Sequence, residues 1–308
     1  MPVIFGETRA LPDLDHALNR PTDDDLCEYA SIGGTGGFGN SKATRLTDAK
    51  CSMRRTSIPR SHGSTRSPPP GLSVTDTAPP RHPLYLLADS QLLFWKRRNR
   101  LLLEAAVDGL AGASPLSAAY IGASNGDRPE YYEIFEAAMD AIGITDRRMI
   151  DSSFGANDRT FLASAQLIVL AGGDVRLGWD TFDRTGMKEV IVGRHEQGAV
   201  LVGISAGAVQ LGRYGIVETP QPPAPEPFGT FDLVPMVIDA HDERGDWARL
   251  SRTVELLEGA VIGLGIPSGA GVIVHPDTTV EPLRRAAHQV RFESGRITRS
   301  LLPAEGSS

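Results

Sequence analysis

The sequence is short of several features that mark whole classes of protein. It has only two cysteines, Cys27 and Cys51, with no CxxC or Cys/His spacing, which argues against a disulfide scaffold or a zinc site. No apolar run approaches the roughly 20 residues that span a bilayer, and the N-terminus does not resemble a signal peptide. The formal net charge of −7 argues against nucleic-acid binding. We therefore expect a soluble, cytoplasmic protein with no nucleic-acid or membrane partner.

Composition divides the chain near residue 82. Residues 1–82 are rich in Gly, Ser, Thr, Pro and Arg and show no sustained apolar period. Such a segment cannot bury enough apolar surface to offset its ordering entropy, so we expect it to be mostly disordered. Its glycine-rich run 33–39 is interpreted as a linker, because no strand precedes it and no helix follows it. The predicted folded part is one domain over residues 83–303.

Strands and helices alternate through this domain. Short apolar runs typical of buried strands lie at 83–88, 117–121, 165–170 and 199–202. Helical patterns lie at 90–103, 130–141, 183–197 and 247–257, and late strands at 261–266 and 271–274, with a hairpin turn at Ser294-Gly295. Repeated strand–helix units with fully apolar strands predict an α/β fold with a doubly wound, mostly parallel sheet covered by helices on both faces.

The segment Gly203-Ile204-Ser205-Ala206-Gly207 has the G-x-S-x-G spacing of a nucleophile elbow, a strained strand-to-helix turn. An apolar strand, 200–202, precedes it, and a plausible helix start, 206–211, follows. The N–H of Ala206 would then face a developing oxyanion. The alternative is a structural serine or a phosphate-binding turn, because the spacing alone is only moderately specific. In this context it predicts Ser205 as a nucleophile.

A serine nucleophile needs a general base. Of seven histidines, His241 is distinctive because it ends the apolar run 234–238, where a strand would deliver a side chain to the ligand-binding edge of the sheet. Taken alone, a histidine there is equally well a surface or capping residue. We expect His195 to be solvated, because it lies in a polar helical stretch, whereas His275 and His288 fall among the late strands.

An acid that orients the base is less sharply defined. Glu218 ends a short apolar stretch after the elbow helix, and Asp239 lies two residues before His241, on the same face of a continuing strand. Asp232 and Glu226 are further candidates. Each of these carboxylates, taken alone, is also consistent with a solvated surface group.

At these residues the chain resembles the peptidase E and cyanophycinase family of serine peptidases, over roughly residues 83–295. Ala171-Gly172-Gly173-Asp174 resembles the family's glycine-rich turn that lends an oxyanion-hole amide. GISAGA, from Gly203 to Ala208, resembles its nucleophile elbow, and 231–241 resembles the stretch leading to its catalytic histidine. The resemblance implies a class I glutamine-amidotransferase-like fold, which is a flavodoxin-like three-layer sandwich.

The resemblance also implies roles for individual residues. The stretch 216–220 falls where the family places the orienting acid, which favours Glu218 over Asp239. Amides of Gly173 and Ala206 would form the oxyanion hole. Residues implied to bind substrate are Asp239, Arg244, Arg249, Asp174, Ser124 and Asn125. Surface ion pairs are an equal alternative for the two arginines, and ordinary turn roles for Ser124 and Asn125.

Two positions depart from the family pattern. The family commonly carries an acidic pair after its late Gly-Ile, whereas Gly265-Ile266 is followed here by Pro267-Ser268. The residue after Gly172-Gly173-Asp174 is Val175, where cyanophycinases tend to have glutamine. Both differences weaken any transfer of substrate preference.

The sequence therefore predicts a dipeptidase or exopeptidase-like serine peptidase that cleaves small peptides through a Ser-His-Glu triad. The most specific version of this prediction places an aspartyl or isoaspartyl residue at the cleaved bond. The mechanism requires no metal or organic cofactor. One alternative is an esterase of the α/β-hydrolase type, which would use a late histidine such as His275 or His288. Another is a non-catalytic binding module on the same fold. A homodimer is left open.

Overall fold

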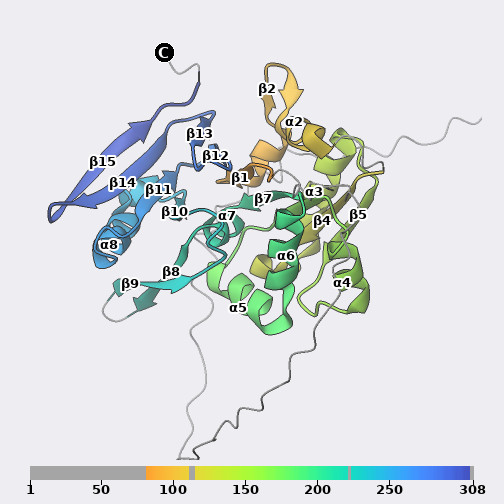
Figure 1. Ribbon diagram of the computed structural model, residues 1–308, viewed down its shortest axis with the longest axis horizontal. Coiled ribbons are helices and arrows are strands. Elements are labelled where there is room, and N and C mark those ends of the chain that lie inside the picture. The colour runs from red at the N-terminus through yellow and green to blue at the C-terminus, as the bar shows by residue number, and fades with distance from the viewer. Residues whose placement is uncertain (1–80, 111–114, 221–222, 306–308) are drawn as a thin grey trace, which may run out of the picture. The chain divides into compact units, whose positions relative to one another are not determined.

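The computed structural model describes residues 81–110, 115–220 and 223–305 (Figure 1). Residues 1–80, which make up nearly all of the extension predicted to be disordered, lie outside these ranges, so that prediction stays untested. The first strand, β1, spans Leu84–Leu87, and the last, β15, spans Arg296–Leu302. Among the described residues, no helix combines the length and apolar character that crossing a membrane requires.

A seven-stranded sheet forms the centre of the fold, in the order β13-β12-β1-β7-β6-β4-β5 (Figure 1). Five strands run parallel: β1, β4 (Ser117–Ile121), β5 (Asp146–Ile150), β6 (Leu167–Leu170) and β7 (Val200–Ile204). Two join antiparallel beyond β1: β12 (Gly271–Val274) and β13 (Val280–Leu283). Every residue of β1, β4, β6 and β7 is buried, as expected for strands covered on both faces.

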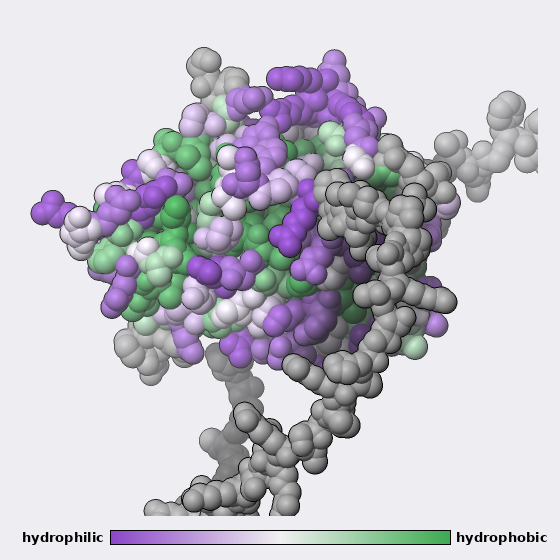
Figure 2. All heavy atoms as spheres, viewed as in Figure 1, coloured by the Kyte–Doolittle hydropathy of each residue, from purple (hydrophilic) through white to green (hydrophobic). Residues whose placement is uncertain are grey.

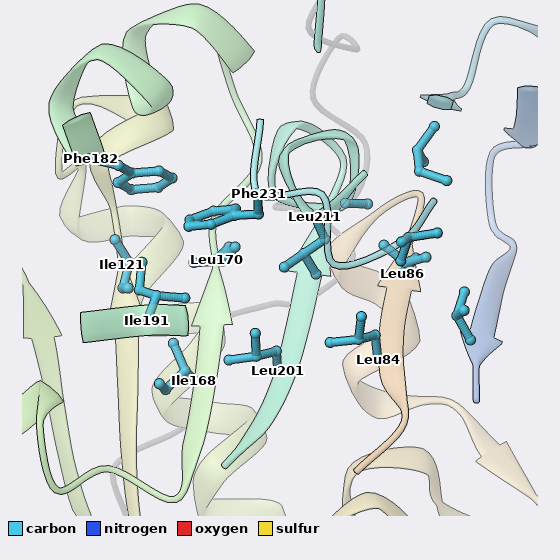
Figure 3. Packing of buried hydrophobic residues seen from close by; sticks show 14 of the residues in the cluster. Leu84, Leu86, Ile121, Ile168, Leu170, Phe182, Ile191, Leu201, Leu211 and Phe231 are labelled. Carbon is cyan, nitrogen blue, oxygen red and sulfur yellow. The ribbon is translucent and has the colours of Figure 1, made fainter. Parts of the chain in front are cut away.

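Helices cover both faces of this sheet, because alternate residues of each strand point to opposite sides. One face carries α4 (Ala156–Leu162), α5 (Val175–Thr185), α6 (Met187–Glu196) and α7 (Ala206–Leu211); the other carries the 3-10 helix η3 (Ser90–Phe94), α2 (Leu102–Val107) and α3 (Pro129–Ala141). Figure 3 shows Phe182 of α5 and Ile191 of α6 packed beside Ile168 and Leu170 of β6. The predicted doubly wound α/β fold is confirmed.

A second sheet, which the sequence analysis did not anticipate, has six strands in the order β15-β14-β11-β10-β8-β9. Besides β15 it contains β8 (Tyr214–Pro220), β9 (Pro223–Gly229), β10 (Met236–Ala240), β11 (Ile262–Ile266) and β14 (Ala287–Glu293). Helix α8 (Ala248–Leu256) covers one face, packing Leu250 and Val254 against Val237. From the other face, Ile238 and Ile266 enter the same core cluster as the first sheet.

Several predicted elements differ in detail. The helix expected over 90–103 is wrong: η3 is followed by a hairpin of β2 (Lys96–Arg97) and β3 (Arg100–Leu101) before α2 begins. Arg98 and Asn99 make its turn at positive φ, and Asp89 caps η3. The helix expected over 183–197 is two helices separated at Gly186, whose φ is +71°. The hairpin turn at Ser294-Gly295 is confirmed between β14 and β15.

The strand order fixes where a ligand site can form. From β4 the chain moves outward to β5 and then returns to β6 on the other side of β4. Such a reversal opens a crevice at the carboxyl ends of the two inner strands, where open α/β sheets bind ligands. The loops that follow β4, β6 and β7 all lie at this edge.

The described surface mixes polar and apolar residues. Hydrophilic and hydrophobic residues are interspersed over the face in Figure 2. The exposed large hydrophobic residues of the described chain are Leu177, Leu256 and Leu301, on α5, α8 and β15 respectively. Single exposed apolar residues are ordinary for a globular protein, so a homodimer stays a prediction.

Candidate active site

Ser205 occupies a strained turn between β7 and α7. The strand ends at Ile204 and the helix begins at Ala206, leaving Ser205 alone between them with φ 48° and ψ −108°. Its N–H donates to the carbonyl of Leu87 in the neighbouring strand at 2.8 Å. Residues other than glycine rarely adopt such a conformation, and when they do it is concentrated at functional sites. The geometry is that of the predicted nucleophile elbow.

Two glycines make this turn sterically feasible. A Cβ on Gly203 would lie 2.5 Å from the carbonyl oxygen of Gly207, because the helix folds back over the end of its strand. A Cβ on Gly207 would lie 2.4 Å from the carbonyl oxygen of Leu170 in β6. Real Cβ atoms do not approach backbone so closely, so the G-x-S-x-G spacing follows from the close crossing of β7, α7 and β6.

His241 meets Ser205 from the second sheet. It follows β10 directly, adopts a left-handed φ of 46°, and its N–H donates to the carbonyl of Ile266 at 2.8 Å. Its Nε2 lies 2.8 Å from Oγ of Ser205. If Nε2 accepts the hydroxyl proton, the neutral ring carries its own proton on Nδ1. The sequence candidate for the base is therefore the histidine that the structure brings to the serine.

The other histidines named as alternatives have different surroundings. His275 contacts Glu281 at 3.1 Å, and His288 lies against the Trp247 ring with centroids 5.1 Å apart. The expectation that His195 is solvated is wrong: it is 5% exposed and its Nδ1 lies 3.3 Å from the carbonyl oxygen of Ala199. Burial lowers the pKa of His195, which favours a neutral ring inside the fold.

The two backbone amides predicted to form the oxyanion hole lie close to Ser205. Gly172 lies against the nucleophile, since a Cβ on it would be 3.3 Å from Cβ of Ser205. Gly173 follows with φ +130°, which a side chain would strain. Within the described residues, neither the N–H of Gly173 nor that of Ala206 has a hydrogen-bond acceptor. Both remain free to donate to a substrate oxygen.

No carboxylate contacts the base directly. Among the described residues, no Asp or Glu oxygen lies within the 4.0 Å ion-pair distance of the His241 ring. Glu218, the acid favoured by the resemblance, is exposed near the end of β8. It lies close enough to Asp242 and Arg249 to raise the pKa of each electrostatically, after larger effects of burial and of Asp239. It therefore belongs to the same charged surroundings without touching the ring.

The other acid candidates have different positions. Asp232 lies 3.1 Å from Nε of Arg213 in an exposed ion pair, and Glu226 is exposed on β9. Asp239 is only 2% exposed, and its carboxylate accepts from both Nε and Nη2 of Arg249, the former at 3.2 Å. Burial alone would lower the pKa of Arg249, but Asp239, together with smaller effects of Asp242 and Glu218, outweighs burial and the pKa is raised. Asp239 and Arg249 therefore neutralise each other.

Two acids that sequence reasoning did not single out follow the histidine. Oδ2 of Asp242 and Oε2 of Glu243 are buried and have no hydrogen-bond partner among the described residues. Burial first, and then the charge of Asp239, raises the pKa of Asp242. Oε1 of Glu243 accepts from the N–H of Ser268 at 3.1 Å. The only sequence signal was their position directly after His241.

The remaining predicted substrate residues have internal partners, with one exception. Oδ1 of Asp174 caps α5 by accepting from the N–H groups of Arg176 and Leu177 at 2.8 and 2.9 Å. Ser124 is buried against Gln210, and Nδ2 of Asn125 donates to the Tyr120 hydroxyl at 2.9 Å. Arg244 is exposed in the 3-10 turn η6 (Glu243–Gly245). Substrate contacts by these side chains stay predictions.

The described part of the chain has no cluster of three or more His, Cys, Asp or Glu residues that could hold a metal ion. The arrangement brings together a serine hydroxyl and an imidazole, close to two backbone amides. A family model described as peptidase family S51 matches residues 86–281, a span that includes both the elbow and His241.

The chain belongs to peptidase family S51. It is a serine peptidase, and its resemblance to the peptidase E family is confirmed. Among solved structures, a peptidase from an acI-B1 Actinobacterium matches the S51 chain at 16% identity and a TM-score of 0.54, covering 74% of this chain and 96% of that one. A putative peptidase E protein from Listeria monocytogenes EGD-e matches at 15% identity and a TM-score of 0.49, covering 66% and 98%. No curated protein matches the sequence. At these identities the first likeness supports the fold alone.

Proposed function

We propose that this S51 peptidase hydrolyses an amide bond of small peptides, as a dipeptidase or exopeptidase-like enzyme, with Ser205 as nucleophile and His241 as base. The observation that carries the proposal is the 2.8 Å contact between Oγ of Ser205 and Nε2 of His241. A serine in ordinary backbone geometry beside a histidine is common. A serine held at φ 48° between a strand and a helix, and in contact with a histidine from another sheet, indicates nucleophilic catalysis.

In the proposed reaction, Oγ of Ser205 attacks the peptide carbonyl carbon while its proton passes to Nε2 of His241. The carbonyl oxygen becomes an oxyanion that accepts hydrogen bonds from the N–H groups of Gly173 and Ala206. His241 then returns the proton to the leaving amine, and the C–N bond breaks to give an acyl-enzyme. Water attacks the ester in the same way: His241 takes a proton from the water and passes it to Oγ of Ser205 as the ester C–O bond breaks and the carboxylic product leaves.

Within this proposal Glu218 is the acid that stabilises the imidazolium of His241. What supports the role is its place among the charges around His241, together with the family resemblance of 216–220. Catalytic hydrogen bonds are often long or absent in a free enzyme and tighten when substrate binds. Asp242 is the second candidate, because its buried Oδ2 lacks a partner and it lies within electrostatic reach of the histidine.

We further propose that the enzyme prefers substrates with an aspartyl or isoaspartyl residue at the cleaved bond. Arg244 supports this, because it is exposed three residues after His241 and has no carboxylate partner among the described residues. Asp239 already neutralises Arg249, whereas Arg244 is a cation without an ion pair among the described residues. A guanidinium binds a carboxylate through two parallel hydrogen bonds, which a neutral side chain cannot match.

A dipeptide screen tests this proposal. We expect turnover of Asp-X or β-Asp-X peptides over Ala-X peptides, and its loss in Ser205→Ala and His241→Ala. Arg244→Met is expected to raise KM for the acidic peptides and leave the others unchanged. No turnover across the library with an intact fold would instead favour a non-catalytic binding module. Hydrolysis of a p-nitrophenyl ester that survives His241→Ala but not His275→Ala would favour the esterase alternative.

A further inference from the structure

One buried side-chain amide connects the elbow helix to the loop after β4 and to the start of α5. Gln210 lies on α7, the helix that begins after Ser205, and it is 0% exposed. Its Nε2 donates to the carbonyl oxygen of Val175 at 2.9 Å and to Oγ of Ser124 at 3.1 Å. Val175 starts α5, after the β6 loop, and Ser124 lies in the β4 loop. The amide therefore links the loop after β4 and the start of α5 to the elbow helix.

The loop that carries Ser124 in turn holds the glycine turn of the oxyanion hole. The carbonyl oxygen of Ser124 accepts from the N–H of Asp174 at 2.8 Å. Gly173 packs so tightly against the same carbonyl that a Cβ on it would lie 2.2 Å from the oxygen. The position of Gly173 and the peptide plane that follows it are thus set by where the backbone of Ser124 lies.

The packing around the Gln210 amide leaves no space for a water molecule that could replace its hydrogen-bond partners. A Cβ on Gly178 of α5 would lie 2.1 Å from Oγ of Ser124 and 2.5 Å from Nε2 of Gln210. The first turns of α5 therefore close directly over the hydrogen bonds. A buried polar group in such a site must keep its partners, because water cannot enter to replace them.

We propose that Gln210 is a positioning residue that fixes the Gly173 amide relative to Ser205. It does so by holding Ser124 and the start of α5 against the elbow helix, and it does not touch substrate. Glutamine fits because its NH₂ supplies two donors, one for a carbonyl and one for a hydroxyl. Methionine has a similar length and no donor. The inference rests on the proposed function, since it concerns the oxyanion hole of that reaction.

The test compares Gln210→Met with the matched control Gln166→Met. Oε1 of Gln166 accepts from N and Oγ of Ser117, both at 2.8 Å, at the opposite end of β4. The second-order rate of labelling by a fluorophosphonate is measured where every variant is fully folded. We expect Gln210→Met to slow labelling by about 10–100-fold, less than the ~10²–10³-fold of deleting an oxyanion donor. Gln166→Met should leave the rate unchanged.

Two further readouts separate positioning from general damage. The pH midpoint of labelling should stay the same in Gln210→Met while its plateau falls, because the Ser205–His241 contact is intact. Hydrogen exchange of a peptide covering 171–178 should rise in Gln210→Met and not in Gln166→Met. Equal rates in Gln210→Met and wild type, equal slowing in Gln166→Met, or a shifted midpoint would overturn the inference while the proposed function stands. Wild-type protein that does not label at Ser205 would contradict both the proposed function and the role of Gln210 in it. The hydrogen-exchange data would still test whether Gln210 holds the segment 171–178 in place.

Discussion

Oγ of Ser205 and Nε2 of His241 lie 2.8 Å apart, although the two residues are 36 positions apart and follow strands of different sheets. The two sheets meet where the chain leaves the elbow helix α7 and packs against the start of β10. There the N–H of Arg213 donates to the carbonyl of Met236 at 2.9 Å, and a Cβ on Gly212 would lie 2.9 Å from that oxygen. The nucleophile and the base therefore come from two sheets whose backbones are in direct contact.

Gly203→Ala is expected to destabilise the elbow, because its Cβ would meet the Gly207 carbonyl at 2.5 Å. Overpacking of this kind costs about 1–3 kcal/mol in the free energy of unfolding. Gly193→Ala in helix α6 is the control: nothing lies within 4 Å of its Cβ, and replacing a helical glycine stabilises by about 0.5–1 kcal/mol. Urea unfolding of both variants measures the difference, and equal midpoints would contradict the steric account of the motif.

The acid of the triad can be found by neutralising one carboxylate at a time. We expect Glu218→Gln to lower kcat by at least about 10²-fold, up to the ~10⁴-fold known when an orienting acid is neutralised in a serine protease. Asp242→Asn and Glu243→Gln should keep kcat within a small factor of wild type. The reverse ranking would move the role to the loop that carries His241, whose buried carboxylate oxygens have no partner among the described residues.

Breaking the Asp239–Arg249 ion pair is expected to cost stability. Arg249→Met leaves the buried carboxylate of Asp239 without its counter-charge. We expect a loss of about 2 kcal/mol, below the ~3–5 kcal/mol of a fully buried pair, because the Arg249 side chain is 35% exposed. The double variant Asp239→Asn/Arg249→Met should lose less than the sum of the two single variants. Strict additivity in that cycle would show that the pair contributes nothing.

Stability should depend on pH through His195. Burial lowers its folded pKa, so below the ordinary histidine pKa of about 6.5 the unfolded chain binds a proton that the folded protein does not. The free energy of unfolding is therefore full at neutral pH and falls as the pH drops through that value. His195→Gln should flatten this dependence between about pH 7 and 5. An unchanged slope in urea titrations would show that another group is responsible.

The site was predictable where chemistry and local pattern coincide. Ser205 was identified by a spacing that the crossing of β7 and α7 requires, and His241 by the end of an apolar run. The parallel core was predictable because its strands are continuous apolar runs. β5 was missed because its sequence, DRRMI, is mostly charged, as an edge strand can be.

The pairing of the late strands into a separate second sheet was not predictable from local pattern. β9 contains prolines at 223, 225 and 227, which argue against a central strand, and it lies at the sheet edge where proline is tolerated. Gln210 was not identified because it looks like any polar residue of a short helix. Its proposed role depends on contacts with Ser124 and Val175, which are far away in sequence.

A cytoplasmic location stays a prediction.

The central claim is that Ser205 is a nucleophile activated by His241, and active-site labelling with a fluorophosphonate tests it most directly. The protein is treated with the probe, digested, and the adduct located by mass spectrometry. We predict one adduct on Ser205, absent in Ser205→Ala and formed far more slowly in His241→Ala. No adduct on the folded protein, or equal labelling of Ser205→Ala, would contradict the account.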